Sequence, residues 1–112
     1  MNITYEEIIS DLRKRIFKPI YFLAGEEPYY IDLISDYIEE KVLSDSEKAF
    51  NQIIIYGEDT TIRDIIETAR RFPMMATHQV IIIKEAQTLK KIDELLVYLE
   101  KPLSSTILVI NY

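Results

Sequence analysis

The sequence contains no cysteine and a single histidine, and both shortages restrict the chemistry open to it. Without cysteine it can form no disulfide, no thiolate metal site and no cysteine nucleophile. His78 alone cannot build a metal centre that needs several histidines. The serine motif G-x-S-x-G of α/β-hydrolases is missing as well. We therefore expect no catalytic residues, no metal site and no cofactor.

Glycine and proline are also scarce, with two and four residues, so long flexible linkers are not expected. No apolar run approaches the roughly 20 residues of a membrane-spanning helix. Residues 1–10, MNITYEEIIS, are acidic and polar, unlike a signal peptide. These features predict a globular, cytoplasmic protein with no membrane partner.

Positive charge is in short supply, because the formal net charge is −6. An acidic surface repels the phosphate backbone, since affinity for DNA comes largely from Lys and Arg. Local basic clusters occur at residues 13–15 and 70–71, but the sequence has no long basic stripe. We therefore expect any relation to DNA to be indirect, through other proteins.

The sequence does contain four apolar runs of strand length, at residues 20–24, 53–56, 80–83 and 107–110. Apolar residues at helical spacing separate them, over residues 5–16, 28–42, 61–72 and 90–100. Apolar, β-branched strands that alternate with helices are typical of a parallel sheet covered on both faces. The fold class is thus predicted as α/β, with a parallel sheet of four or five strands and helices on both faces.

Details of the helices follow from the same spacing. Asn2 or Thr4 is expected to cap the first helix, and Thr60 or Thr61 the third. The apolar stripe of the first helix extends to Ile16. In the second helix the stripe starts at Tyr30, and in the last helix it comprises Ile92, Leu95, Leu96 and Leu99.

The chain is predicted to form one domain, with an N-terminal helix in residues 1–17 and a sheet-and-helix core in residues 18–112. The last strand ends close to the end of the sequence, where a parallel sheet would ordinarily continue with another helix. The sequence is therefore expected to be part of a longer protein.

The stretch GEEPYYID, residues 25–32, follows the first strand, where many α/β proteins bind phosphate. A P-loop needs a Gly-Lys pair and a hydroxyl residue after its first glycine, and none follows Gly25 at that spacing. Glu26 and Glu27 would instead repel phosphate. After the third strand, Lys84 stands where a magnesium-binding acid is needed. These residues argue against an active P-loop ATPase.

Acidic residues after the first strand also allow an alternative, a receiver-type phosphoacceptor signalling domain. In such domains an acidic pair binds magnesium, and an aspartate after the third strand accepts phosphate. Here Lys84 occupies the acceptor position, and an amine cannot form an acyl phosphate. Glu85 lies one residue further along.

The connection between the third helix and the third strand is unusually apolar. It carries Phe72, Met74 and Met75, with Arg70 and Arg71 beside them. Connections normally run over the surface and are polar, and methionine is frequent at adaptable binding surfaces. We predict that at least one of the two methionines is exposed. For Phe72, packing at the end of the sheet core is favoured, and a partner contact is the alternative.

Three segments together resemble one known family. They are PIYFLAGEEPYYID at 19–32, FPMMATHQVIIIKEAQTL at 72–89 and ILVIN at 107–111. From Lys18 to Tyr112 the sequence resembles the N-terminal domain of the delta subunit of the bacterial DNA polymerase III clamp loader. The resemblance implies an AAA+-like, P-loop-like three-layer sandwich whose nucleotide site has degenerated. Asn111 would occupy the position of a polar sensor residue.

The resemblance also implies a function in DNA replication. Such a domain is not an enzyme: it binds the sliding clamp, the beta subunit, and helps to open the ring. Other clamp-loader subunits would bind through later, C-terminal domains. The family's binding motif falls on Pro73-Met74-Met75-Ala76, which makes Met74 and Met75 the anchors, with Phe72 and Pro73 beside them. Two methionines depart from the aromatic or leucine anchors that are more usual there.

Overall fold

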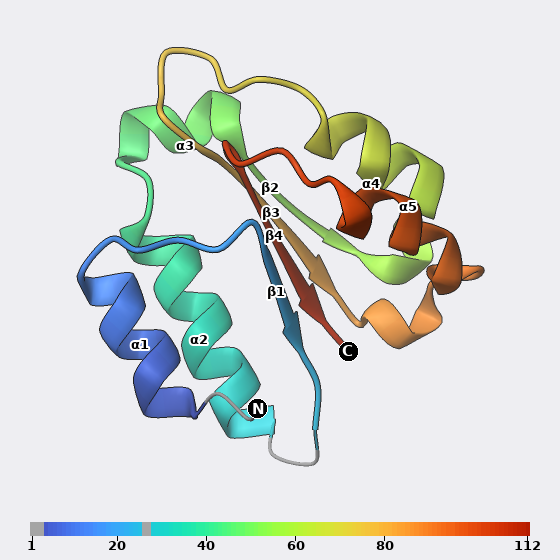
Figure 1. The fold of residues 1–112 in the computed structure, drawn as a ribbon, viewed down its shortest axis with the longest axis horizontal. Coiled ribbons are helices and arrows are strands. Elements are labelled where there is room, and N and C mark those ends of the chain that lie inside the picture. Colours follow the sequence, from blue (N-terminus) through green and yellow to red (C-terminus); the bar gives the residue numbers. More distant parts are fainter. Residues whose placement is uncertain (1–3, 26–27) are drawn as a thin grey trace.

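The computed structural model describes residues 4–25 and 28–112. In this part of the chain, four parallel strands form one sheet in the order β1-β4-β3-β2 (Figure 1). Their bounds are β1 Ile20–Leu23, β2 Gln52–Tyr56, β3 Gln79–Lys84 and β4 Thr106–Asn111. The predicted parallel α/β sheet is therefore confirmed. No helix in the described residues is long and apolar enough to cross a membrane.

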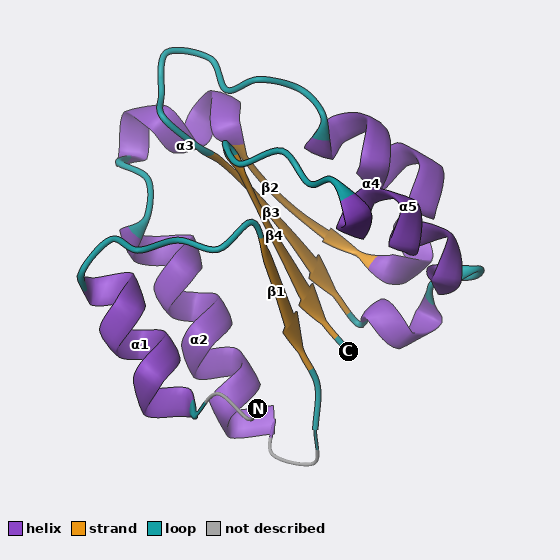
Figure 2. Cartoon of the chain, viewed as in Figure 1, coloured by secondary structure: helices purple, strands orange, loops and turns teal. Residues whose placement is uncertain are grey.

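Helices cover both faces of the sheet, as predicted (Figure 2). On one face lie α1 Tyr5–Arg13 and α2 Pro28–Lys41, and on the other lie α4 Ile62–Ala69 and α5 Leu96–Glu100. A further helix, α3 Asp45–Asn51, precedes β2, and short 3₁₀ turns occur at Gly57–Asp59, Ala86–Thr88 and Ile92–Leu95. Thr4 caps α1 and Thr61 caps α4, each through its side-chain oxygen. Asn2 lies outside the described residues.

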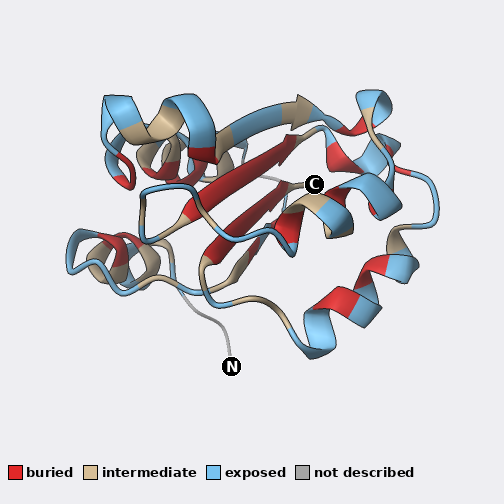
Figure 3. Ribbon diagram, turned by 90° about the horizontal axis from the view of Figure 1, so that it is seen from above, coloured by how far each residue is buried: buried red, intermediate tan, exposed pale blue. Residues whose placement is uncertain are grey.

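The core is divided by the central strands into two layers. Along β3, Val80 and Ile82 face α1 and α2, whereas Ile81 and Ile83 face α4 and α5, because successive strand side chains point to opposite faces. Strands β3 and β4 are buried along almost their whole length (Figure 3). This double burial explains why both read as continuous apolar runs.

The two edge strands are less buried than their sequences predict. On β2, Ile53, Ile54 and Tyr56 are exposed, and on β1 Phe22 is exposed. The expectation that all four apolar runs are covered on both faces is wrong for these two strands. An apolar run alone does not distinguish a central strand from an edge strand.

Three helix predictions also need correction. The helix α1 ends at Arg13, and Ile16 lies beyond it and is exposed. In α2, Tyr30 is exposed and packs against Tyr5.

In the last helical segment, Leu96 and Leu99 are exposed, and Tyr98 is buried instead. Its first turn is 3₁₀, which shifts the inward face relative to an α-helix over residues 90–100. The hydroxyl of Tyr98 accepts a hydrogen bond from the Leu103 amide at 3.2 Å, so this tyrosine satisfies its polar end inside the core.

Candidate partner-binding loop

We call the connection from α4 to β3, residues 70–78, the methionine loop. It lies at the amino ends of the strands and passes close to α3 (Figure 1). The helix α4 that leads into it has its apolar stripe, Ile62, Ile65 and Ala69, buried against the sheet. The position of the loop is therefore set by elements that belong to the core.

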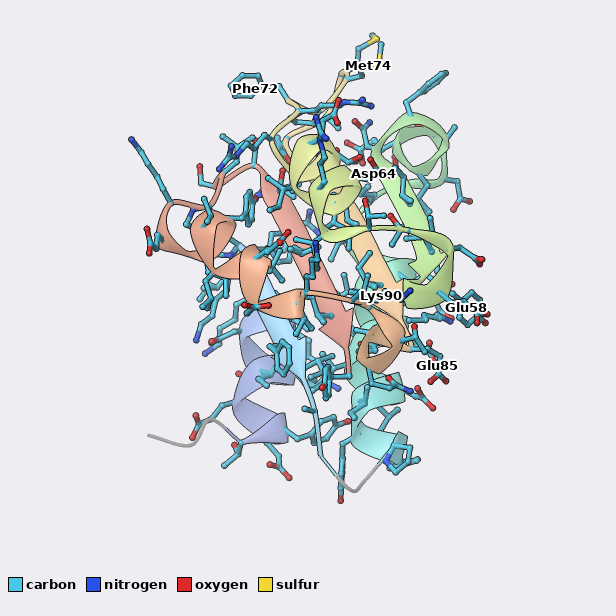
Figure 4. The ribbon with its side chains drawn as sticks, turned by 90° about the vertical axis from the view of Figure 1, so that its right-hand side faces the viewer. Glu58, Asp64, Phe72, Met74, Glu85 and Lys90 are labelled. Carbon is cyan, nitrogen blue, oxygen red and sulfur yellow. The ribbon has the colours of Figure 1, made fainter. Side chains whose placement is uncertain are left out.

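The apolar side chains of the methionine loop are exposed. The exposed fraction is 100% for Met75, 76% for Phe72 and 64% for Met74, while Pro73 is half-buried. Figure 4 shows Phe72 and Met74 at one end of the molecule, pointing away from the ribbon. The predicted exposure of at least one methionine is confirmed, and the favoured core position for Phe72 is wrong. Phe72 lies beyond the end of α4, whose last buried residue is Ala69.

A buried amide holds the middle of the loop in place. The Met74 amide donates to Asn51 Oδ1 at 2.7 Å, and Asn51 Nδ2 donates to the Met74 carbonyl at 2.8 Å. Asn51 Nδ2 also donates to the Glu47 carbonyl in α3 at 3.1 Å. Asn51 is only 4% exposed, so these bonds form largely away from water. The backbone of Met74 is thereby tied to the end of α3.

The beginning of the loop is tied down by a second polar side chain. Gln79, the first residue of β3, donates through Nε2 to the carbonyls of Arg71 and Thr68 at 2.7 and 3.0 Å. Its Nε2 also lies 2.9 Å from Thr106 Oγ1, which itself donates to the Ala69 carbonyl at 2.6 Å. The carbonyls at the end of α4 accept hydrogen bonds in this way. Phe72 follows directly after a firmly held turn.

The backbone at Met75 is held in the left-handed region, with φ of 54°. A residue with a Cβ adopts this conformation at a cost, of order 1–3 kcal/mol, that the surrounding structure must offset. The paired hydrogen bonds between Asn51 and Met74 lie directly before this residue. They hold the turn at which the fully exposed Met75 side chain leaves the surface.

Phe50 is a candidate site residue that the sequence analysis missed. It lies in α3 next to Asn51 and is 76% exposed. The short helix α3 was not predicted, because its seven residues show no apolar stripe. A signal was nevertheless present: Ser44 and Glu47 have the spacing of a capping box, and both reciprocal hydrogen bonds form.

On the other side of the loop, His78 connects it to the segment before β1. The His78 ring packs edge-on against Phe17 with centroids 5.3 Å apart, and the Arg15 guanidinium lies 4.9 Å above the Phe17 ring. Burial, and then the positive charge of Arg15, lower the pKa of His78 below its ordinary value of 6.5. His78 is therefore neutral at pH 7, which suits a half-buried imidazole beside a cation.

The opposite edge of the sheet, at the carboxyl ends of the strands, carries the other sequence candidates. A hollow of about 240 Å³ there is lined by residues that include Gly25, Lys84, Glu85 and Asn111. Asn111 Nδ2 donates to the Ser35 hydroxyl at 3.0 Å, so the proposed sensor position is engaged within the core. Glu26 and Glu27 lie outside the described residues. The methionine loop is thus at the far end from any nucleotide-type crevice.

The strand order contradicts the receiver-type alternative. Receiver domains share the flavodoxin-like order 2-1-3-4-5, in which the first strand lies between the second and third. Here β1 is at the edge, and β4 separates it from β3. Residues at the ends of the first and third strands are therefore not neighbours as a receiver site requires.

These features define an α/β domain that displays an apolar loop at the amino ends of its strands. The family model of DNA polymerase III, delta subunit, matches residues 21–112. The chain therefore belongs to the DNA polymerase III delta subunit family. A search of the curated proteins finds no match.

Among solved structures, the chain is similar to the Bacillus subtilis DNA clamp loader delta protein (YqeN). The TM-score is 0.81 at 22% sequence identity, and the similarity covers 96% of this chain. It covers 35% of that protein, so the chain spans about a third of its length. At this identity the likeness shows the fold alone.

Proposed function

We propose that this chain is the part of a clamp-loader delta subunit that binds the sliding clamp and helps to open its ring during DNA replication. The observation that carries the proposal is the display of Met74 and Met75, 64% and 100% exposed, on a tethered loop in a member of the delta subunit family. Phe72 and Pro73 complete the proposed contact. The chain itself performs no chemistry in this role.

The physical basis is burial of apolar surface in a pocket of the clamp. A side chain of this size contributes about 1.5–3 kcal/mol when it is fully buried. The Asn51 and Gln79 hydrogen bonds hold the loop backbone before binding, which lowers the ordering cost of association. A loop of this kind would favour the open ring only if the open clamp binds it more tightly than the closed clamp does.

Other partners follow from the same proposal. Binding of the remaining clamp-loader subunits would fall to regions of a longer delta protein, because the similarity covers 35% of the Bacillus subtilis protein. Contact with DNA would be indirect, through the assembled clamp and loader. The net charge of −6 agrees with this division, because an acidic domain gains little from direct contact with phosphates.

Titration of the chain against the sliding clamp of the same organism, by calorimetry or surface plasmon resonance, tests the proposal. The Met74→Ala/Met75→Ala double variant should bind at least ~10-fold more weakly, since even one lost anchor exceeds 1.4 kcal/mol. A Leu96→Ala/Val97→Ala double variant is the matched control, because it removes two exposed apolar side chains from α5, outside the methionine loop. It should bind like the parent.

Each contrary result has a distinct meaning. Absence of binding by the parent chain would overturn the proposed function. Binding that survives the Met74→Ala/Met75→Ala change, with circular dichroism showing an intact fold, would move the site away from the methionine loop. Equal losses in both double variants would indicate non-specific apolar adhesion instead of a defined site.

A further inference from the structure

The segments that precede the four strands carry a concentration of positive charge. Residues 14–19, 42–51, 70–78 and 101–105 hold only two acidic side chains, Asp45 and Glu47. Their basic side chains are Lys14, Arg15, Lys18, Lys48, Arg70, Arg71 and Lys101. The chain as a whole has a net charge of −6, so this end is opposite in sign to the rest of the molecule.

These segments lie together because all four strands are parallel, which brings their amino ends to one edge of the sheet. Direct contacts join them around the methionine loop. The His78 ring packs on Phe17, Asn51 bonds to Met74, and the Gln79 amide donates to the Ser105 carbonyl at 2.9 Å. The positive charge therefore lies at the same end of the molecule as the exposed methionines.

Helix stability accounts for part of this charge. Lys14, Arg70 and Lys101 cap the carboxyl ends of α1, α4 and α5, where a cation interacts favourably with the helix dipole. Arg71 and Lys18 lie beyond those caps and are exposed. A helix dipole does not explain them.

Intramolecular ion pairs do not neutralise the cluster either. Over residues 4–25 and 28–112, the ion pair found is the one between Lys48 and Asp45, at 3.8 Å. Arg15 instead donates to the Val42 carbonyl at 3.0 Å and lies over Phe17. In the described structure, the guanidinium groups of Arg70 and Arg71 and the Lys18 ammonium have no carboxylate partner.

We propose that the partner surface that receives the methionine loop is an apolar pocket bordered by carboxylates, and that Arg70, Arg71 and Lys18 form a cationic rim that steers its approach. This inference rests on the proposed function and adds the charge of the partner's surface to it. An apolar centre with a charged rim is the usual anatomy of a protein–protein contact.

A nucleic-acid partner fits the same charges less well. Exposed methionines form no favourable contact with a phosphate backbone. The residues outside these segments carry a net charge more negative than the −6 of the whole chain, so they would repel it. Complementary charge at a rim acts mainly on the association rate, and salt screens it. The cationic rim should therefore change the association rate more than the final affinity.

The test is the association rate constant of the chain with the sliding clamp, followed by stopped flow from about 50 to about 500 mM salt. We expect the rate to fall by roughly 10-fold across this range. An Arg70→Gln/Arg71→Gln variant should associate about 3–10-fold more slowly at low salt, with little change in the dissociation rate. A Lys90→Gln/Lys91→Gln variant, with two exposed cations lost from the opposite edge of the sheet, should behave like the parent.

The outcomes separate this inference from the proposed function. Binding whose rate does not depend on salt, or that is unchanged in Arg70→Gln/Arg71→Gln, overturns the cationic rim and leaves the proposed function standing. Absence of any binding to the clamp overturns both. Binding of single-stranded or duplex DNA that the same variant loses would overturn the inference in favour of a nucleic-acid surface.

Discussion

Asn51 and Met74 are 23 positions apart in the sequence, and their paired hydrogen bonds join a helix end to an exposed loop. The Asn51 amide offers one acceptor and two donors, and all three functions are used, because its Nδ2 also donates to the Glu47 carbonyl. The side chain thus replaces a strand partner for the backbone of Met74. The position of Met75 therefore depends on Asn51, a buried residue.

Replacing Asn51 with Ala should therefore loosen the methionine loop. Loss of these buried hydrogen bonds should lower the free energy of unfolding by about 1–3 kcal/mol. Hydrogen exchange measured by NMR should show a faster-exchanging Met74 amide. In Asn51→Asp the carboxylate still accepts from that amide but cannot donate to the Met74 carbonyl, so protection of the amide should be intermediate. Unchanged exchange at Met74 in Asn51→Ala would show that the loop is held by other contacts.

The hydrogen-bond network of Gln79 and Thr106 should behave as one unit. Gln79→Leu removes the side-chain donor of the Arg71 carbonyl, and Thr106→Val removes the 2.6 Å hydrogen bond to the buried Ala69 carbonyl, so each should cost about 1–3 kcal/mol of stability. Because the two side chains also bond to each other, the double variant should lose less than the sum of the single losses. Urea denaturation of the four proteins in this cycle measures the difference. Strictly additive losses would show that the two side chains act independently.

Sequence patterns predicted the elements whose burial is regular. Strands β3 and β4 are apolar at every central position because helices cover both their faces, and the parallel sheet follows directly from them. The exposure of Ile53, Ile54 and Phe22 could not be predicted, since strand order decides which strands lie at an edge.

The site was predictable only in part. Two adjacent methionines in a connection were a visible signal, and both are exposed. The position of Phe72 depends on the end of α4, where Gln79 and Thr106, from more distant parts of the sequence, bond to the backbone carbonyls. Likewise, the contact between Asn51 and Met74 is a long-range hydrogen bond that leaves no local pattern. Periodicity reports local burial, and it does not report such tertiary bonds.

Phe50 should contribute to binding of the clamp, if the proposed site is correct. Its side chain is 76% exposed and its neighbour Asn51 bonds directly to the methionine loop, so we expect a partner that covers Met74 to contact the ring as well. Phe50→Ala should weaken binding by roughly 5-fold or more, since burial of even part of an aromatic side chain contributes about 1 kcal/mol. Stability should hardly change, because an exposed ring contributes little to the core. An unchanged affinity would restrict the contact to the methionine loop.

Protonation of His78 should destabilise the fold at mildly acidic pH. Burial and the Arg15 charge lower the pKa of His78 below 6.5, so the unfolded chain binds the proton more tightly than the folded chain. The free energy of unfolding therefore rises with pH in this range. The stability that the neutral His78 contributes is present above pH 6.5 and is lost as the pH falls through the pKa of His78 in the folded chain. The urea midpoint of the parent should fall more between about pH 7.5 and about pH 5.5 than that of His78→Gln.

A carboxylate supplies the control for this pH dependence. The hydrogen bond from the Ser44 amide lowers the pKa of Glu47 below 4.5, so the stabilising effect of that capping residue is present above pH 4.5 and is lost only at lower pH. Glu47→Gln should therefore leave the slope between about pH 7.5 and about pH 5.5 unchanged. If the parent and His78→Gln have the same slope, the imidazole is not the titrating group, and the packing of His78 on Phe17 does not depend on its charge.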